Sequence, residues 1–301
     1  MRTPVAFIIF NRPEVTARVF AEIARARPEK LLVVADGARD GRPGEREACE
    51  QTRAVVERVD WDCEVLENFS DVNLGCRRRV ASGITWVFEQ VEEAIILEDD
   101  CVPHPSFFPF CEEILERFRE DERVMMVSGD NFQFGHRRTP YSYYFSRMAH
   151  IWGWASWRRA WRHYDVGMKL WDDLRDTPWL LDLFGDAEVA ALWRTIFDKT
   201  RAGFNTWDYQ WAFACWTQHA LAVLPERNLI SNIGFGAMAT HTKAVSREAN
   251  IPVEAMEFPL RHPPYMVHNR EADLYTIREL MLPEKRTLLN RLRGRLAPAA
   301  S

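Results

Sequence analysis

The sequence predicts an α/β protein with a mainly parallel sheet flanked by helices, and a second half rich in aromatic residues. Over the first 127 residues, short apolar runs alternate with stretches of helical periodicity, which is the pattern of β-α-β crossovers. Polar residues follow several of these runs, at the strand ends where open α/β sheets bind ligands. Ten of the 12 tryptophans lie in the 65 residues from Trp152 to Trp216.

Each element of the first half has a local signal. After Pro13, the side chains of Val15, Val19 and Ile23 share one helical face. The apolar runs expected to form strands are residues 5–10, 31–35, 63–66, 94–97 and 124–127. The intervening patterns expected to form helices begin at Pro13 and cover residues 45–59, 80–91 and 106–119.

After residue 128 the pattern changes. Residues 141–145 are expected to form an aromatic strand, residues 153–164 a Trp-rich helix, and residues 186–201 and 208–219 two further helices. No linker separates the halves. We therefore expect one catalytic domain over residues 1–258, with a nucleotide-sugar-binding half (1–127) and an acceptor-side half (128–258), and a C-terminal extension over 259–301.

Composition excludes several classes of protein. The 301 residues include 39 Lys and Arg and 44 Asp and Glu, a net charge of −5. A mildly acidic chain has no general attraction for nucleic acid, so none is expected as a partner. The longest apolar run, residues 5–10, is far shorter than the roughly 18 residues of a membrane span. With no secretory signal and no C-x-x-C pair among its six cysteines, the chain is expected to be cytoplasmic.

Familiar nucleotide-binding loops are missing. Neither G-x-G-x-x-G after the first strand nor G-x-x-x-x-G-K-[ST] occurs, which disfavours a dinucleotide-dependent dehydrogenase and a P-loop NTPase. The segment Asp36-Gly37-Ala38-Arg39-Asp40-Gly41 follows the second strand. It is equally compatible with an ordinary turn and with a ligand-facing loop.

The sharpest motif is Glu98-Asp99-Asp100, directly after the apolar run 94–97. Three adjacent carboxylates repel one another unless a cation or a ligand dipole compensates. Mg²⁺ and Mn²⁺ prefer oxygen ligands and commonly bridge one or two carboxylates to a diphosphate. The alternative is a solvated acidic loop that precedes the next helix.

Further candidates each have an ordinary structural interpretation. Arg12, or Arg77 within an Arg triplet, would hold a phosphate at a helix start, but the triplet more often marks a solvated face. The carboxyl of Asp208, between two tryptophans, would have the raised pKa of a general base, or it would simply cap a helix. His241 is more often structural than a ligand. Most of the tryptophans should be core residues, although some would offer platforms for sugar rings.

Taken together, these residues resemble the GT-A-fold nucleotide-sugar transferases, nearest of them the N-acetylglucosaminyltransferase I family and bacterial sugar-transferase-like proteins. The resemblance covers residues 4–242. Its most specific stretch, residues 95–108, reads I-I-L-E-D-D-C-V-P-H-P-S-F-F: an apolar strand, E-D-D, then a Pro and a paired Phe. Also similar are Phe10-Asn11-Arg12, Asp36, Gly153-Trp154, and Trp207-Asp208 ahead of Trp211.

The resemblance implies a metal-dependent glycosyltransferase that inverts anomeric configuration. Arg12 and Asp36 would contact the nucleotide, Asp36 at the base, and Asp99 would meet the ribose. Asp100 would bind the Mn²⁺ or Mg²⁺ that bridges the diphosphate. Asp208 would be the general base. The matching stretches also contain Asn11, Glu98 and Trp154, which are expected at the donor together with Arg77 of the Arg triplet, and His241 is expected at the metal or diphosphate.

The donor implied is a UDP-sugar, and the acceptor a glycan or lipid-linked glycan in bacterial surface glycan assembly. This chain departs from the family in three places. The family's W-D-D-W is one residue longer here, as Trp207-Asp208-Tyr209-Gln210-Trp211. The N-terminal anchor of the Golgi members is missing. Residues from 259 onward have no counterpart, and acceptor specificity is expected there.

Other functions remain open at this point. A nucleotidyltransferase would use the same strand-end carboxylates, and a degenerate site would make the protein a carbohydrate- or nucleotide-binding module. The presence of both Asp100 and Asp208 disfavours the second. A glycosidase needs two carboxylates but no E-D-D cluster.

The C-terminal tail has its own prediction. Residues 284–296 contain five basic residues, one acidic residue and four leucines along one helical face. Such a helix is compatible with peripheral contact with an anionic membrane, but a solvated or packed terminal helix is the favoured interpretation.

Overall fold

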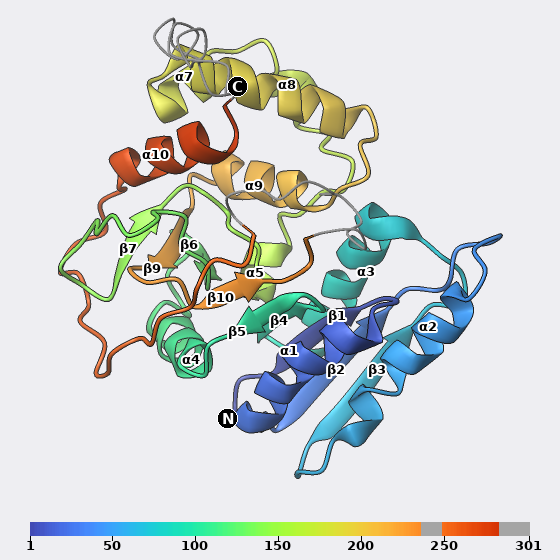
Figure 1. Cartoon of the computed structure of the whole chain (residues 1–301). Helices are drawn as coiled ribbons and strands as arrows, with labels where there is room; N and C mark the ends of the chain where they lie inside the picture. The colour runs from blue at the N-terminus through green and yellow to red at the C-terminus, as the bar shows by residue number, and fades with distance from the viewer. Residues whose placement is uncertain (236–248, 283–301) are drawn as a thin grey trace, which may run out of the picture.

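One mixed sheet organises the protein. Within residues 1–235 and 249–282, which the computed structural model describes, eight strands pair in the order β3-β2-β1-β4-β8-β6-β9-β7 (Figure 1). These strands are β1 (Val5–Ile9), β2 (Lys30–Ala35), β3 (Glu64–Phe69), β4 (Glu93–Glu98), β6 (Val124–Ser128), β7 (Tyr143–Ser146), β8 (Trp154–Trp157) and β9 (Leu221–Pro225). Strands β5 (Cys101–Pro103) and β10 (Ile230–Asn232) form a separate antiparallel pair. The predicted α/β fold is confirmed.

Helices cover both faces of this sheet. They are α1 (Pro13–Ala26), α2 (Glu45–Arg53), the 3-10 turn η1 (Val56–Arg58), α3 (Gly75–Gln90), α4 (Phe107–Arg117), α5 (Arg158–Trp161), α6 (Trp171–Leu174), α7 (Trp179–Phe184), α8 (Ala187–Arg201), α9 (Asp208–Thr217) and α10 (Arg270–Leu280). Along β1, Ala6 and Ile8 pack with Ile84 of α3, while Phe7 packs with Val19 of α1. Because both faces are buried, β1 is apolar throughout.

The first four strands of the large sheet set the position of the site. Strand β1 pairs in parallel with β2 and with β4, and Ile8 lies opposite Glu98 in the register. The carboxyl ends of β1, β2 and β4 therefore meet at one edge. Arg12, Asp36 and Asp99 follow these three strands, so chain segments far apart in sequence converge there.

The prediction of a Trp-rich helix over 153–164 is wrong. Residues Trp154–Trp157 form β8, which runs antiparallel between β4 and β6, and only Arg158–Trp161 is helical. Trp154 packs on one face of the sheet and Trp157 on the other. A strand buried on both faces shows no alternation of apolar and polar residues, so its periodicity does not distinguish it from a buried helix.

Aromatic side chains fill the core of the second half, where α7, α8, α9 and α10 gather at the top of the view in Figure 1. Trp154 stacks on Trp207 with ring centroids 5.8 Å apart, and Trp161 stacks on Tyr164 at 4.2 Å. The expectation that most tryptophans are core residues is confirmed. Those buried are Trp61, Trp154, Trp157, Trp161, Trp171, Trp193, Trp207, Trp211 and Trp216.

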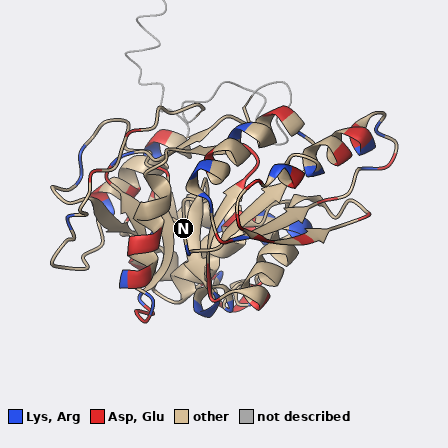
Figure 2. Ribbon diagram, turned by 90° about the horizontal axis from the view of Figure 1, so that it is seen from below, with Lys and Arg blue, Asp and Glu red and all other residues tan. Residues whose placement is uncertain are grey.

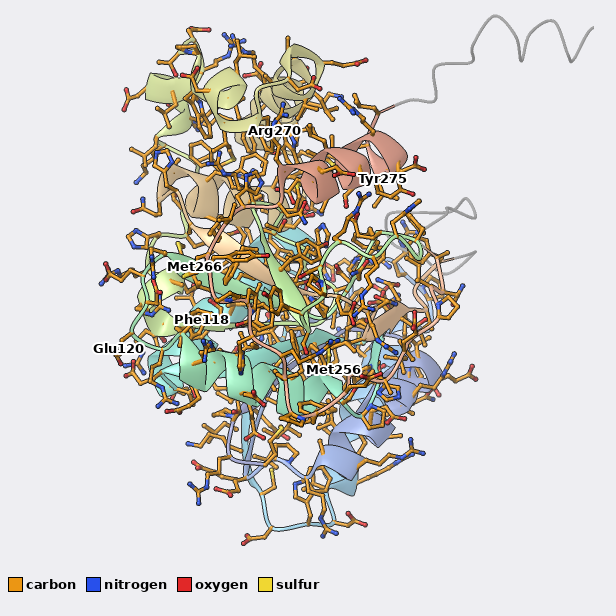
Figure 3. All side chains as sticks on the ribbon, turned by 90° about the vertical axis from the view of Figure 1, so that its left-hand side faces the viewer. Phe118, Glu120, Met256, Met266, Arg270 and Tyr275 are labelled. Carbon is orange, nitrogen blue, oxygen red and sulfur yellow. The ribbon has the colours of Figure 1, made fainter. Side chains whose placement is uncertain are left out.

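Helix α10 is held against both the sheet edge and α7. The buried carboxylate of Asp273 accepts a hydrogen bond from the Ser146 hydroxyl at 2.5 Å and one from the Arg147 amide at 2.9 Å. Arg270, labelled in Figure 3, donates from Nε to the carbonyl of Phe184 at 2.7 Å. A segment outside the resemblance thus packs on the sheet and on α7.

Charged residues of both signs are spread over helices and loops, as Figure 2 shows. Several form ion pairs, such as Arg201 with Asp172 at 2.7 Å.

In the part of the chain that the structure describes, no helix is long and apolar enough to cross a bilayer. The basic tail, 284–296, lies outside the described residues, so its membrane contact stays a prediction. The domain limits also stay a prediction.

Candidate active site

A cleft of about 530 Å³ opens at the carboxyl edge of the parallel strands. Its walls come from both halves of the chain, because Trp152 and residues 204–209 face the loops after β1, β2 and β4. The predicted site residues that line it are Arg12, Asp36, Glu98, Asp99, Asp100 and Asp208. The structure thus gathers donor, metal and base candidates around one cavity.

Arg12 is the cation that faces the acidic triplet. Its Nη2 atom bonds to Asp99 Oδ1 and lies 2.9 Å from Asp100 Oδ2, and its Nε atom donates to Asp99 Oδ2 at 3.3 Å. Burial alone would lower the pKa of Arg12, but the two carboxylates outweigh burial and raise that pKa above its usual value. The guanidinium therefore stays charged and offsets much of the repulsion between the two acids.

The remaining repulsion appears in the protonation of Glu98. Burial, reinforced by the charges of Asp100 and Asp99, raises the pKa of Glu98 to about 8. Burial also raises the pKa of Asp99, although Arg12 opposes that shift. At neutral pH Glu98 is largely protonated, so the triplet carries less negative charge than its sequence suggests.

Asp36 organises the loop that leads into α3. Its Oδ1 accepts from the amides of Gly37 at 3.0 Å and Leu74 at 2.9 Å. Its Oδ2 accepts from Asn73 Nδ2 and from the Gly75 amide, both at 3.0 Å. Asp36 lines the cleft, but its carboxylate is already engaged by four donors of this chain.

Three predicted donor residues do not line the cleft. Asn11 donates to Glu45 Oε1 at 3.0 Å, and Arg77 donates from Nη2 to the carbonyl of Val166 at 2.7 Å. Trp154 has 0% of its surface exposed and lies in the aromatic core. Because a side chain without exposed surface has no face for a ligand, this arrangement gives Trp154 a packing role.

Asp208 is the first residue of α9 and lines the same cleft as the strand-end carboxylates. The hydroxyl of Thr206 donates a hydrogen bond to its Oδ1. The charge of Asp208 contributes to raising the pKa values of Glu98 and of Cys76, so these groups share one electrostatic environment. Asp208 also lines a second, smaller pocket next to the cleft.

The fit of a divalent ion depends on Asp100. Among residues 1–235 and 249–282, no three His, Cys, Asp or Glu side chains are grouped as ligands of one metal ion. Asp100 would therefore have to share an ion with oxygens of a bound diphosphate or of water. The chain passes close to this carboxylate, since a Cβ at Gly234 would lie 1.9 Å from Asp100 Oδ2. The second predicted metal residue, His241, lies outside the described residues.

Several cleft residues carry no sequence signal of their own. Arg39, in the glycine-rich turn after β2, lines the cleft and pairs with Glu45. Trp152 and Tyr209 line both the cleft and the second pocket. The buried His150 lies 2.7 Å from Asp130 in that second pocket. The sequence did mark their surroundings in three cases, by the glycines of the turn around Arg39, by the Trp-rich stretch that begins at Trp152 and by the motif that contains Tyr209.

Comparisons with known proteins show loose structural likeness. No family model and no curated protein matches the chain. Among solved structures, 4-diphosphocytidyl-2C-methyl-D-erythritol synthase from Anaerococcus prevotii matches with a TM-score of 0.38 and 8% identity, over 74% of this chain and 88% of that one. A UDP-glucose pyrophosphorylase complexed with UDP-glucose matches with a TM-score of 0.38 and 9% identity, over 75% and 90%. Mouse xyloside xylosyltransferase 1 matches with a TM-score of 0.33 and 11% identity, over 72% and 83%. Likenesses this loose carry no argument about function.

Proposed function

We propose that the protein is a metal-dependent inverting glycosyltransferase that moves a sugar from a nucleoside-diphosphate sugar to a hydroxyl acceptor. The observation that carries the proposal is the composition of the cleft. Arg12, Asp99 and Asp100 line the cleft together with Asp208, which is more than a hundred residues away in sequence. A cation, metal-ligating oxygens and a separate carboxylate are what sugar transfer from a diphosphate requires.

On the donor side, this chain would hold the nucleotide and neutralise its leaving group. Asp99 would accept hydrogen bonds from the ribose, and Asp36 would lie at the base. A Mn²⁺ or Mg²⁺ ion held by Asp100 and by phosphate oxygens would supply Lewis-acid stabilisation of the departing diphosphate. Arg12, whose guanidinium already lies against Asp100, would add a second positive charge.

On the acceptor side, Asp208 would act as the general base. As the acceptor oxygen forms its bond to the anomeric carbon, the bond to the diphosphate breaks on the opposite face, and the configuration inverts. The hydroxyl proton passes to the carboxylate of Asp208. A positioned base of this kind typically contributes about 10²–10⁴-fold to the rate.

A nucleotidyltransferase is the second candidate. Three arginines, Arg12, Arg39 and Arg79, line the cleft, and the guanidinium groups of Arg12 and Arg39 together would suit a triphosphate. The same strand-end carboxylates would serve that reaction. The two functions differ in the product released, a nucleoside diphosphate in one case and inorganic diphosphate in the other.

Product analysis separates the candidates. The full chain is incubated with a panel of UDP-sugars in Mn²⁺, in Mg²⁺ and in EDTA, and UDP release is measured. In parallel it is incubated with UTP and hexose 1-phosphates, and inorganic diphosphate is measured. We expect metal-dependent UDP release, slow with water alone as the acceptor. Inorganic diphosphate release without UDP release would instead establish the nucleotidyltransferase.

A further inference from the structure

The loop between α8 and α9 brings two further side chains to the cleft besides Asp208. Phe204 and Asn205 both line the cavity. Residues 201–205 are exposed, and Phe204 keeps 51% of its surface accessible to solvent. An exposed aromatic face that lines a cleft is available to a flat ligand.

The carboxamide of Asn205 is held in one orientation. Its Oδ1 accepts a hydrogen bond from the amide of Arg77 at 3.0 Å. Because a backbone N–H can only donate, the oxygen of the carboxamide must face α3, and Nδ2 takes the other position. Within residues 1–235 and 249–282, Nδ2 donates to no other group. Its two N–H groups are therefore available to a ligand in the cleft.

Asn205 lies at the β2 end of the cleft. A Cβ at Gly75 would lie 3.6 Å from both Oδ1 and Nδ2 of Asn205, and the Gly75 amide donates to Asp36, directly after β2. Asp100, in contrast, follows β4. Strand β1 separates β2 from β4, and neighbouring strands are about 4.8 Å apart, so the two strand ends are roughly 10 Å apart. A nucleoside diphosphate with its phosphates at Asp100 would extend its base toward Asp36.

Asp36 itself has little capacity left for the edge of a base. Its two oxygens already accept four hydrogen bonds from donors of this chain. A carboxylate offers about four lone pairs, so these bonds engage it fully. Recognition of the base therefore requires another polar group at this end, and Asn205 Nδ2 is a donor there without a partner among the described residues.

We propose that Phe204 and Asn205 form the base-binding part of the donor site. Phe204 packs against the face of the nucleobase, and Asn205 donates from Nδ2 to a carbonyl oxygen of that base. This assignment rests on the proposed function, because it takes the cleft to hold a nucleoside-diphosphate donor. A base with carbonyl groups, such as uracil, is preferred over adenine, which has none. Asp36 is then a positioning residue that holds the start of α3, on which Asn205 is oriented.

Nucleotide binding by the full chain tests the assignment. Calorimetry measures the affinity for UDP and for ADP, each with Mn²⁺. Phe204→Ala removes the aromatic face, and Asn205→Asp keeps the oxygen that accepts from Arg77 but replaces Nδ2 by a second oxygen. The matched controls are Tyr265→Ala, which removes an equally exposed ring outside both cavities, and Gln90→Glu, which adds a negative charge at the exposed end of α3. Thermal unfolding checks that each variant folds.

We expect the parent and both controls to bind UDP more tightly than ADP. Phe204→Ala should lose roughly tenfold in affinity for both nucleotides, because stacking on an aromatic ring tolerates any base. Asn205→Asp should lose roughly tenfold for UDP and much less for ADP, since only uracil offers the carbonyl oxygen.

Unchanged UDP affinity in the two folded variants overturns the assignment, as does a parent that binds neither nucleotide or binds ADP as tightly as UDP. Equal losses for UDP and ADP in Asn205→Asp would attribute the effect to the added charge and overturn the hydrogen bond from Asn205. If UDP binding depends on Phe204 and Asn205 but no UDP-sugar is turned over, the base-binding site stands and the proposed function fails.

Discussion

Arg12 Nη2 lies 2.9 Å from Asp100 Oδ2, so the carboxylate expected to bind a metal ion already has a positive partner from its own chain. The sequence argument for a metal began from the mutual repulsion of Glu98, Asp99 and Asp100. The structure meets that repulsion in two ways, by the guanidinium of Arg12 and by a proton on Glu98. Because these two groups already reduce the repulsion, the repulsion alone does not establish a metal ion. The metal is therefore tested by removing Asp100, its proposed ligand.

Asp100→Ala should abolish metal-dependent nucleotide binding. Removing the carboxylate leaves the ion without its protein ligand, and we expect at least a tenfold loss of affinity for UDP in Mn²⁺. Calorimetry of Mn²⁺ with UDP measures this. Asp62→Ala, on the exposed surface before β3, is the control and should bind as the parent does. Equal affinity in Asp100→Ala would remove Asp100 as the ligand.

Arg12→Ala should destabilise the protein in the absence of ligands. It leaves Asp99 and Asp100 as like charges without their shared cation, and breaking a buried pair in this way costs about 3–5 kcal/mol. Urea unfolding measures the change. Arg25→Ala removes an exposed guanidinium that pairs with Glu22 on α1, and it should cost no more than about 1 kcal/mol. Similar losses for the two variants would show that the triplet does not depend on Arg12.

Glu98 should make stability fall as the pH rises. Its pKa is about 8 in the folded protein, against an ordinary value of 4.5, so the folded state binds more protons than the unfolded state between these values. Its stabilising contribution is complete below about pH 4.5 and is lost as the pH rises through about 8. Asp99, whose pKa is also raised, acts in the same direction.

Urea unfolding in EDTA from pH 5 to pH 9 measures this dependence. Glu98→Gln should flatten the curve by up to about 1.4 kcal/mol per pH unit, the limit for one proton. Glu89→Gln, on the exposed side of α3, should retain the parent's slope. A Glu98→Gln variant that loses stability as steeply as the parent would place the proton elsewhere.

Asp208→Asn should keep donor binding but lose catalysis. The amide retains the shape of the side chain and its hydrogen bond with Thr206, but it cannot take a proton. We expect UDP affinity within about twofold of the parent, and UDP-sugar turnover reduced by roughly 10²-fold or more. Asp182→Asn, exposed on α7, serves as the control. Full turnover by Asp208→Asn would assign the base to another residue, with Asp130 or Asp165 next in line.

The sequence by itself predicted the parts of this protein that depend on local patterns. Strands buried on both faces are apolar throughout, so β1, β2 and β4 were recognisable, and the polar residues after them mark the ligand edge. Asp36, Asp100 and Asp208 were found in this way or by their motifs, and all three line the cleft.

Only the tertiary structure decided which side chains meet. Arg12 and Asp99 are 87 positions apart, so no local pattern shows that they pair. Strand β8 was not recognised for the same reason, because its tryptophans are buried on both faces of the sheet and show no local pattern. The structure also shows that Trp154 lies in the core rather than at the donor. His150 and Asp130 likewise become a pair only because β6 and β8 lie side by side. Burial and ion pairing act through space, and the fold alone determines which residues share that space.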